Sequence, residues 1–527
     1  MPDPYEETGF GGGLYGDGMS VTVGSALTFE DVVSVASNGA PVEIERDVAE
    51  RMAPARRIIE DAIRSGLTMY GVTTGFGGLA NVRIPADEAI ALQRDIVRSH
   101  ATAVGEHLSQ EVVRAMMLLR ARTFAFGISG VRFDVVERFV QLLNANIHPV
   151  VPAQGSLGAS GDLALLAHLA LPIMGEGEVE VDGERLPAGD ALRRAGIEPL
   201  ELSFKEGLAL VNGTEAMLAL GILTCTGAER LARVADIAGA MTLEACLGTD
   251  QAFDAELIAL RKHDAPEVVA TNLRGLLAGS GIVESHRESD HLVQDAYSLR
   301  CMPQVHGAYR DGMLYVRRTL EAELASAIDN PSVLADRGLV MSGGNFHGEA
   351  LGLALDHLTL CVTGFATISE RRVARLVDPE LNNGLPAFLT RDPGRRSGFM
   401  LSQYTSASLV SENRSLCFPA SSDTISTSAG QEDHVSMGAT SARKAAQVLV
   451  NSEHALAIEL LAAAQGIDLR APLAPAAGTG AALEAVRSVS PTLEQDRSLA
   501  ADIGAVRSMY KSGALEAKTA AAGMRIS

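Results

Sequence analysis

The spacing of apolar residues predicts long helices in the second half of the chain. One stripe of apolar residues steps by 4, 3, 4 and 3 positions along a helix: Leu351, Leu355, Leu358, Val362 and Phe365. This spacing places all five on one helical face. Segments 303–331 and 441–465 are also helical in character; the first begins at Pro303 and stops at Asn330-Pro331, and the second is rich in alanine. Three helices of this length pack most simply as a bundle.

The first half of the chain shows shorter elements. Residues 135–146 are expected to form a helix that ends before Pro149, and 179–186 a small hairpin around Asp182-Gly183. Few runs alternate between apolar and polar residues, so strand content should be low and the fold mainly α. We expect a flexible tail over residues 1–22, an N-terminal domain over 23–220, and a long helical bundle with a C-terminal helical region over 221–527.

Composition narrows the class of protein. The 527 residues are 47% hydrophobic and 21% charged, and the formal net charge is −21, which makes nucleic acid and anionic membranes poor partners. The apolar run from Leu163 to Met174 is too short to span a bilayer. The first residues lack the basic and apolar regions of a secretory signal, and the five cysteines form no CxxC pair. A cytoplasmic protein is therefore expected.

Two familiar patterns are weak here. Gly75–Ala80 fits a relaxed dinucleotide-binding pattern, but that pattern requires a strand before it and a helix after it, and neither is predicted. The twelve histidines show no HxxxH or similar ligand spacing. Neither nucleotide binding nor a metal site is expected.

Residues 153–177, AQGSLGASGDLALLAHLALPIMGEG, contain three glycines at intervals of three. One interpretation is structural: a glycine-rich entry to a helix, with Asp162 as its N-cap. The other is chemical. The amide nitrogen of Gly161 can attack the carbonyl carbon of Ala159, and loss of water from the ring and from Ser160 leaves a methylidene electrophile. The tight backbone that this closure needs is one that glycine permits.

The segment GSLGASGDLA resembles the signature of the aromatic amino acid ammonia-lyases and aminomutases. Further blocks of the chain resemble that family in the same order: YGVTTGFG (70–77), LVNGT (210–214), QDAYSLRCMPQ (294–304), SGGNFHGE (342–349) and QEDHVSM (431–437). The resemblance implies a 4-methylidene-imidazol-5-one prosthetic group formed from Ala159, Ser160 and Gly161, with no external cofactor. It also implies a fumarase/aspartase-like, mainly α fold, in which an N-terminal domain carries this group ahead of a long helical bundle.

By the same resemblance, the protein is a homotetramer whose bundles pack together, and each active site draws residues from three chains. The apolar stripe that begins at Leu351 agrees with this assembly, on the expectation that one subunit does not cover it alone. The partner is otherwise a small amino acid substrate.

Site residues follow from the resemblance. Tyr70 matches the catalytic base, and its phenol needs a pKa lowered by its surroundings to act near neutral pH. Arg300 matches the group that binds the substrate carboxylate, and Asn212 a hydrogen-bonding partner near the prosthetic group. Tyr297, also expected to be catalytic, and the substrate-binding Gln294 would share one face with Arg300 if the segment is helical.

Three further positions concern the substrate pocket and its specificity. Phe346 resembles a pocket-lining aromatic residue. His100, preceded by Ser99, and Glu432, preceded by Gln431, resemble the pairs found in histidine-specific members. An imidazole can pair with a carboxylate such as Glu432, whereas a phenyl ring would leave that charge uncompensated.

The expected reaction is therefore elimination of ammonia from L-histidine to give trans-urocanate. Two alternatives stay open. One is a tyrosine or phenylalanine ammonia-lyase or aminomutase, since some tyrosine aminomutases share the Ser-His pair and Thr73. The other is an inactive family member.

Overall fold

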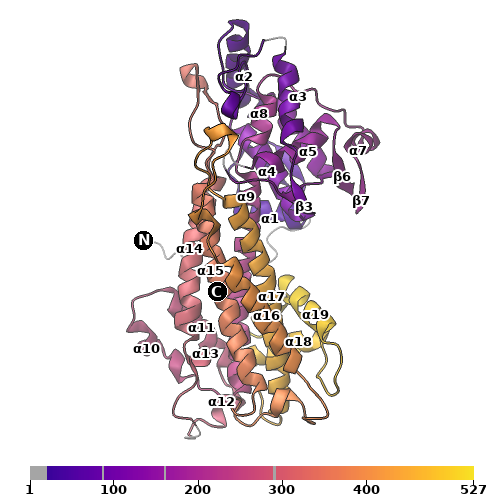
Figure 1. Cartoon of the computed structure of the whole chain (residues 1–527). Helices are drawn as coiled ribbons and strands as arrows, with labels where there is room; N and C mark the ends of the chain where they lie inside the picture. The colour runs from indigo at the N-terminus through magenta and orange to yellow at the C-terminus, as the bar shows by residue number, and fades with distance from the viewer. Residues whose placement is uncertain (1–19, 86–87, 159–161, 289–291) are drawn as a thin grey trace.

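A computed structural model describes residues 20–85, 88–158, 162–288 and 292–527 of the chain, and it is elongated (Figure 1). The N-terminal elements gather at one end, and long helices run from there along the molecule. The mainly α fold expected from the sequence is confirmed.

The N-terminal part consists of short helices and short strands. Its helices are α1 Phe29–Ser37, α2 Val48–Arg64, α3 Ala89–His100, α4 Gln110–Ala125, α5 Phe133–Asn144, α6 Leu163–Ala170, α7 Ala188–Ala195 and α8 Glu206–Val211. Its strands are β1 Val21–Val23, β2 Val42–Ile44, β3 Val104–His107, β4 His148–Pro149, β5 Pro152–Gln154, β6 Glu178–Val181 and β7 Glu184–Pro187. β1 pairs with β2 in parallel, and the predicted hairpin is confirmed as β6–β7, whose turn residues Asp182 and Gly183 both have positive φ. The predicted helix 135–146 corresponds to α5.

The bundle consists of five long helices: α9 Glu215–Ala245, α14 Met302–Leu324, α15 Glu349–Val377, α16 Met400–Leu416 and α17 Gly438–Leu469. The remaining helices surround it: α10 Ala255–Ala259, α11 Ala265–Leu277, α12 Gly281–Glu284, α13 Tyr297–Arg300, α18 Ala477–Val489, α19 Ala500–Lys511 and α20 Ala514–Ala521. Strands β8 Ser332–Leu334 and β9 Leu339–Met341 pair with each other, and β8 packs against α2 of the N-terminal part. α15 packs against α17, α14 and α9, which places it at the centre. Alanine-rich helices such as α17 form readily and approach their neighbours closely.

Buried ion pairs set the register of these helices. Arg372 of α15 donates to Glu459 of α17 at 2.5 Å, with both side chains fully buried, and Thr242 of α9 donates to the same carboxylate at 2.8 Å. Asp236 of α9 accepts from His306 and Arg310 of α14 at 2.7 Å each. A buried charge must meet its partner, so such pairs favour one alignment of the helices over shifted ones.

Two expectations about these helices need correction. The stripe that begins at Leu351 is buried within the single chain, because α9, α14 and α17 cover it. The helix expected to reach Asn330-Pro331 ends at Leu324, and Asp329 pairs instead with buried Lys205 at 2.6 Å. The boundary expected after residue 220 falls inside α9, which runs unbroken through it; the division into two domains stays a prediction.

One described helix, α15, is long and apolar enough to cross a membrane by length and composition alone. Of its most apolar 18-residue window, 72% is buried inside the protein. That burial, at the centre of five packed helices, is typical of a core helix.

Candidate active site

A cavity of about 180 Å³ lies where the N-terminal part meets the bundle. Its lining includes four of the residues expected in the site: Tyr70, His100, Asn212 and Glu432. The other lining residues are Phe76, Gly77, Leu163, Leu208, Asn330 and Ser428. Residues far apart in the sequence thus converge on one pocket, which has both titratable groups and apolar walls.

Tyr70 lies in the loop between α2 and α3. Its phenol oxygen accepts a hydrogen bond from the backbone N–H of Gly77 at 2.9 Å. Burial is the main cause that raises the pKa of Tyr70, and the nearby Glu432 carboxylate raises it further, while the Gly77 N–H lowers it. The lowered pKa expected for a base is therefore not produced by the described residues of one chain, because desolvation outweighs the single favourable donor.

His100 is the last residue of α3. Its Nδ1 lies 2.7 Å from the carbonyl oxygen of Ile96, so Nδ1 carries the proton and Nε2 is left as an acceptor. Burial lowers the pKa of His100, which keeps the ring neutral near pH 7. The ring of Phe76 lies 5.0 Å from the imidazole, centroid to centroid, and supplies an apolar wall.

Glu432 is held in a loop that contacts the Tyr70 loop. Thr427 donates its hydroxyl to the Glu432 carboxylate at 3.2 Å, and the Gly78 N–H donates to the Ser428 hydroxyl at 2.9 Å. Gly77 has a φ of +54°, and a Cβ there would lie only 2.1 Å from the Ser428 oxygen. Glycine is needed at position 77, because any side chain would separate the two loops.

Asn212 joins α8 to α9 at the floor of the cavity. Its side-chain amide donates to the carbonyl oxygen of Asn330 at 3.0 Å. Its Oδ1 is buried and has no hydrogen-bond partner among the described residues. Because a buried acceptor without a partner is costly, this oxygen is suited to accept from a bound group.

The tripeptide Ala159, Ser160 and Gly161 lies outside the described residues, but both flanks are held at the cavity. Gly158 has a φ of +72°, its carbonyl accepts from the Ser436 hydroxyl at 3.1 Å, and a Cβ there would lie 2.2 Å from that hydroxyl oxygen. On the other flank, the Asp162 N–H donates to the carbonyl of Gly213 at 2.5 Å, one residue from Asn212. Two features fit the prosthetic group that the sequence implies: the close approach of the Gly158 backbone to Ser436, and the Asn212 oxygen without a partner among the described residues.

Asp162 has a different role from the N-cap that one interpretation of the sequence predicts. Although it occupies the N-cap position of α6, its side chain makes no capping bond there. Its carboxylate accepts instead from the backbone N–H groups of Ala216 and Met217 at 2.8 and 2.9 Å, at the start of α9. Full burial is the largest influence on this carboxyl group and raises the pKa of Asp162 to about 7.

Gln294, Tyr297 and Arg300 are not brought to the cavity. They lie at and just before α13, near the opposite end of the bundle from α3 and α8 (Figure 1). Arg372 of α15 reaches the carbonyl of Ser298 in α13, and from Glu349 to Arg372 helix α15 rises about 35 Å. Within one chain, these residues are too distant to share a substrate with Tyr70.

The local geometry of this segment is also informative. Gln294 precedes α13, so the expectation that it shares a helical face with the other two is wrong. Tyr297 and Arg300 do share a face: the guanidinium carbon lies 4.7 Å from the ring centroid. Tyr297 is 72% exposed, and Arg300 Nε is buried without a hydrogen-bond partner among the described residues. An exposed tyrosine beside an unpaired arginine nitrogen suggests a surface completed by another molecule.

Phe346 is half-buried in the segment before α15 and is not among the residues that line the cavity. Its predicted pocket role is thus untested by the geometry of one chain.

The chain matches the family "Aromatic amino acid lyase" over residues 27–488. It belongs to the aromatic amino acid lyase family. Among curated relatives, the histidine ammonia-lyase of Sorangium cellulosum (strain So ce56) is 51% identical over 501 residues, covering 94% of this chain and 97% of the relative. The histidine ammonia-lyase of Gloeobacter violaceus is 50% identical and covers 95% of this chain and 97% of its own.

The backbone of this aromatic amino acid lyase is about equally similar to solved structures of two enzymes with different activities. A histidine ammonia-lyase from Trypanosoma cruzi has a TM-score of 0.88 and 42% identity, and covers 96% of each chain. A tyrosine aminomutase from streptomyces globisporus has a TM-score of 0.89 and 38% identity, and covers 95% of this chain and 99% of its own. The backbone is shared by both, so specificity must come from side chains in the pocket.

Some pocket residues of this aromatic amino acid lyase were not expected from the sequence. Phe76 and Gly77 belong to the Gly75–Ala80 segment and to the family-like block 70–77, but neither residue is among the predicted site residues. Ser428 precedes the QEDHVSM block by three residues, and Asn330 was considered only as a helix stop. The available signal was the glycine pair around Phe76, which marks a close approach of backbone to another segment.

Proposed function

We propose that this chain is an ammonia-lyase that converts L-histidine to trans-urocanate and ammonia. The observation that carries the proposal is the shared cavity of Glu432, His100 and Tyr70. A carboxylate and a neutral imidazole nitrogen are both acceptors, and a protonated imidazole ring offers two N–H donors to them. A phenol offers one donor and no charge, and a phenyl ring offers none. The curated relatives at about 50% identity support the same substrate.

Each pocket residue has its own role in the proposed reaction. In this proposal the Tyr70 oxygen accepts the proton from the substrate β-carbon, and the Gly77 N–H, which donates to that oxygen at 2.9 Å, stabilises the phenolate. Glu432 and His100 hold the ring, and the Asn212 Oδ1 accepts a hydrogen bond from the bound substrate or prosthetic group. The methylidene-imidazolone formed from residues 159–161 supplies an electrophile that no unmodified side chain offers. Loss of the β-proton and cleavage of the Cα–N bond leave the double bond of urocanate and free ammonia.

Purified full-length protein tests the activity directly. We expect urocanate absorbance with L-histidine, and neither coumarate from tyrosine nor cinnamate from phenylalanine. Coumarate without urocanate would establish the tyrosine alternative, and no product with any of the three would favour an inactive member. Intact mass separates the prosthetic group from the substrate question, because ring formation removes two waters, about 36 Da. Ser160→Ala should show neither the mass loss nor activity while keeping the fold.

The assembly is a second part of the proposal: a homotetramer in which Arg300, Tyr297 and Gln294 of other subunits complete each cavity. The rise of about 35 Å along α15 from Glu349 to Arg372 supports this, because it separates α13 from the cavity within one chain. Exposed apolar side chains on the bundle support it too: Leu353 at 49%, Leu360 at 52%, Tyr315 at 48%, Leu401 at 56% and Tyr404 at 61%. Such exposed apolar surface is typical of a subunit interface.

Complementation tests the shared site. Tyr70→Phe and Arg300→Ala should each be nearly inactive alone. The two variants are then co-expressed with separate tags, and mixed assemblies are purified through both tags. With random mixing, these assemblies should recover about a quarter of wild-type activity, because some sites receive both native side chains. Lack of recovery in proven mixed assemblies would mean that each site is built from one chain.

We also propose a cytoplasmic location. All five cysteines are free thiols, which suits a reducing compartment.

A further inference from the structure

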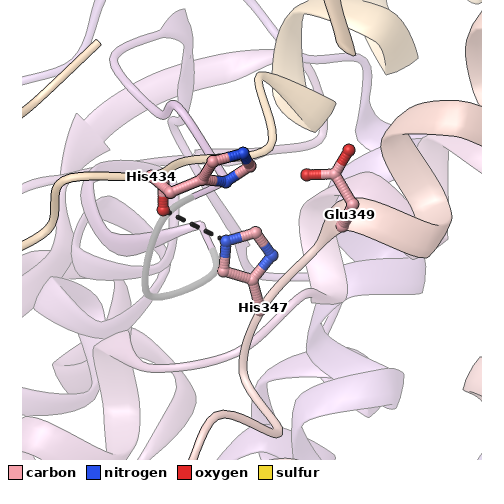
Figure 2. A group of neighbouring side chains, drawn as sticks. All are labelled: His347, Glu349 and His434. Atoms are coloured by element: carbon pink, nitrogen blue, oxygen red, sulfur yellow. Dashed lines mark hydrogen bonds between the residues drawn. The ribbon is translucent and has the colours of Figure 1, made fainter. Parts of the chain in front are cut away.

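Three potential metal ligands meet where the loop that carries Glu432 contacts the start of α15. His347 and Glu349 lie at the start of α15, and His434 lies two residues after Glu432 (Figure 2). One ligand atom from each of the three lies within 4.8 Å of the others. None of the three lines the cavity, so the proposed reaction leaves them without a role.

One hydrogen bond prepares the imidazole of His347 as a ligand. His347 Nε2 donates to the backbone carbonyl of His434 at 3.2 Å, which fixes the proton on Nε2. Nδ1 is therefore left with a lone pair, and in Figure 2 this second ring nitrogen lies on the side of Glu349. A ligating histidine ordinarily donates its other N–H to such a carbonyl, which orients the ring.

Glu349 supplies the negative charge. Its Oε2 is buried and has no hydrogen-bond partner among the described residues. A buried carboxylate oxygen without a donor is costly, and a cation removes that cost. The rings of His347 and His434 lie 5.8 Å apart, centroid to centroid, at an interplanar angle of 37°.

We propose that His347, Glu349 and His434 bind a divalent first-row transition-metal ion such as Zn²⁺. Two imidazoles and one carboxylate form a donor set that this class of ion favours, with the remaining positions open to water. Ligand atoms around a tetrahedral Zn²⁺ are separated by about 3.3 Å, so the observed spacing closes with side-chain movements of about 1 Å. The spacing of 87 residues between the two histidines explains why no local sequence pattern marks the site.

A bound ion would join two segments that matter to the pocket. One is the start of α15, next to Phe346. The other continues from His434 to Ser436, whose hydroxyl holds the carbonyl of Gly158. The ion would therefore have a structural role and hold the Glu432 loop against the start of α15.

Metal titration of untagged, chelator-treated full-length protein tests this directly. We expect one Co²⁺ per chain, with the visible absorption of a low-symmetry site, and displacement of Co²⁺ by Zn²⁺. Glu349→Gln and His434→Gln should each weaken Zn²⁺ binding at least about 100-fold, since even outer partners of a ligand typically contribute about 10- to 100-fold. His263→Gln, at an exposed histidine outside the cluster, should bind as the wild type does.

The outcomes are decisive even if a variant folds poorly. Anomalous scattering at the zinc edge from wild-type crystals soaked in Zn²⁺ should give a peak between the three side chains. A peak only elsewhere, no binding below millimolar Zn²⁺, or unchanged affinity in a folded Glu349→Gln protein would overturn the proposal. The test is independent of the histidine activity, because the readout is the metal itself.

Discussion

Replacing Glu432 by glutamine removes one charge from the pocket and almost no volume. Thr427 can still donate to the remaining side-chain oxygen, as it now does at 3.2 Å, so the loop should keep its conformation. What is lost is a charge-assisted hydrogen bond to the substrate ring, worth about 1.5–3 kcal/mol. At about 1.4 kcal/mol per factor of ten, kcat/KM for L-histidine should fall about 10- to 150-fold.

The same substitution should move the pH dependence. The Glu432 carboxylate raises the pKa of Tyr70 and that of His100, because a negative charge favours the protonated form of each. Without it both pKa values fall. The pH profile of kcat/KM has an acidic limb, where His100 becomes protonated, and a second limb set by Tyr70. Both limbs should therefore shift to lower pH.

The assay is urocanate absorbance measured across pH at subsaturating L-histidine. Asp433→Asn is the matched control, since it removes one charge from an adjacent, exposed residue outside the cavity. If Glu432→Gln stayed within threefold of wild type with unshifted limbs, Glu432 would not contact the substrate ring. A loss of equal size in Asp433→Asn would mean that the effect is long-range charge and not contact.

Three further predictions concern stability and assembly. The buried Asp162 carboxyl keeps its proton longer when folded, with a pKa of about 7 against 3.8, so its contribution to stability falls as pH rises from 4 to 7, by up to about 4 kcal/mol. Asp162→Asn should therefore raise the thermal midpoint at pH 8 relative to wild type and not at pH 4; an equal change at both would refute the assignment. Lys205→Met leaves Asp329 buried and unpaired where the two now meet at 2.6 Å, and should cost about 3–5 kcal/mol in urea unfolding; Lys205→Met with Asp329→Asn should recover part of this. Leu360→Asp should dissociate the assembly in light scattering and lower activity with it, whereas Leu257→Asp, at an equally exposed 52%, should do neither; intact Leu360→Asp assemblies would place the interface elsewhere.

The sequence by itself determined the local structure and the chemistry available. A stripe that steps by 4 and 3 predicts a helix because neighbours at those spacings share a face, and α15 follows it. The Asp182-Gly183 pair likewise predicts a hairpin turn, because both residue types tolerate positive φ, and the structure has this turn between β6 and β7. The signature around residues 159–161 identified the family, since it depends on residue types in one short segment.

Only the tertiary structure decided which faces and side chains meet. Whether the α15 stripe was covered could not be known from α15 alone, and α17 covers it. One interpretation of the sequence makes Asp162 the cap of its own helix, yet its carboxylate accepts from backbone N–H groups at the start of α9. Both outcomes depend on where a distant segment packs, which local spacing does not encode.

The same reason applies to the two sites. Tyr70 and Glu432 become neighbours because Gly77 and Ser428 allow two loops to touch. His347 and His434 meet although 87 residues separate them. Arg300, placed beside Tyr70 by resemblance, lies near the opposite end of the bundle from the helices that border the cavity (Figure 1). Sequence patterns indicate what each residue can do, whereas the distances between remote segments are set only when the whole core packs.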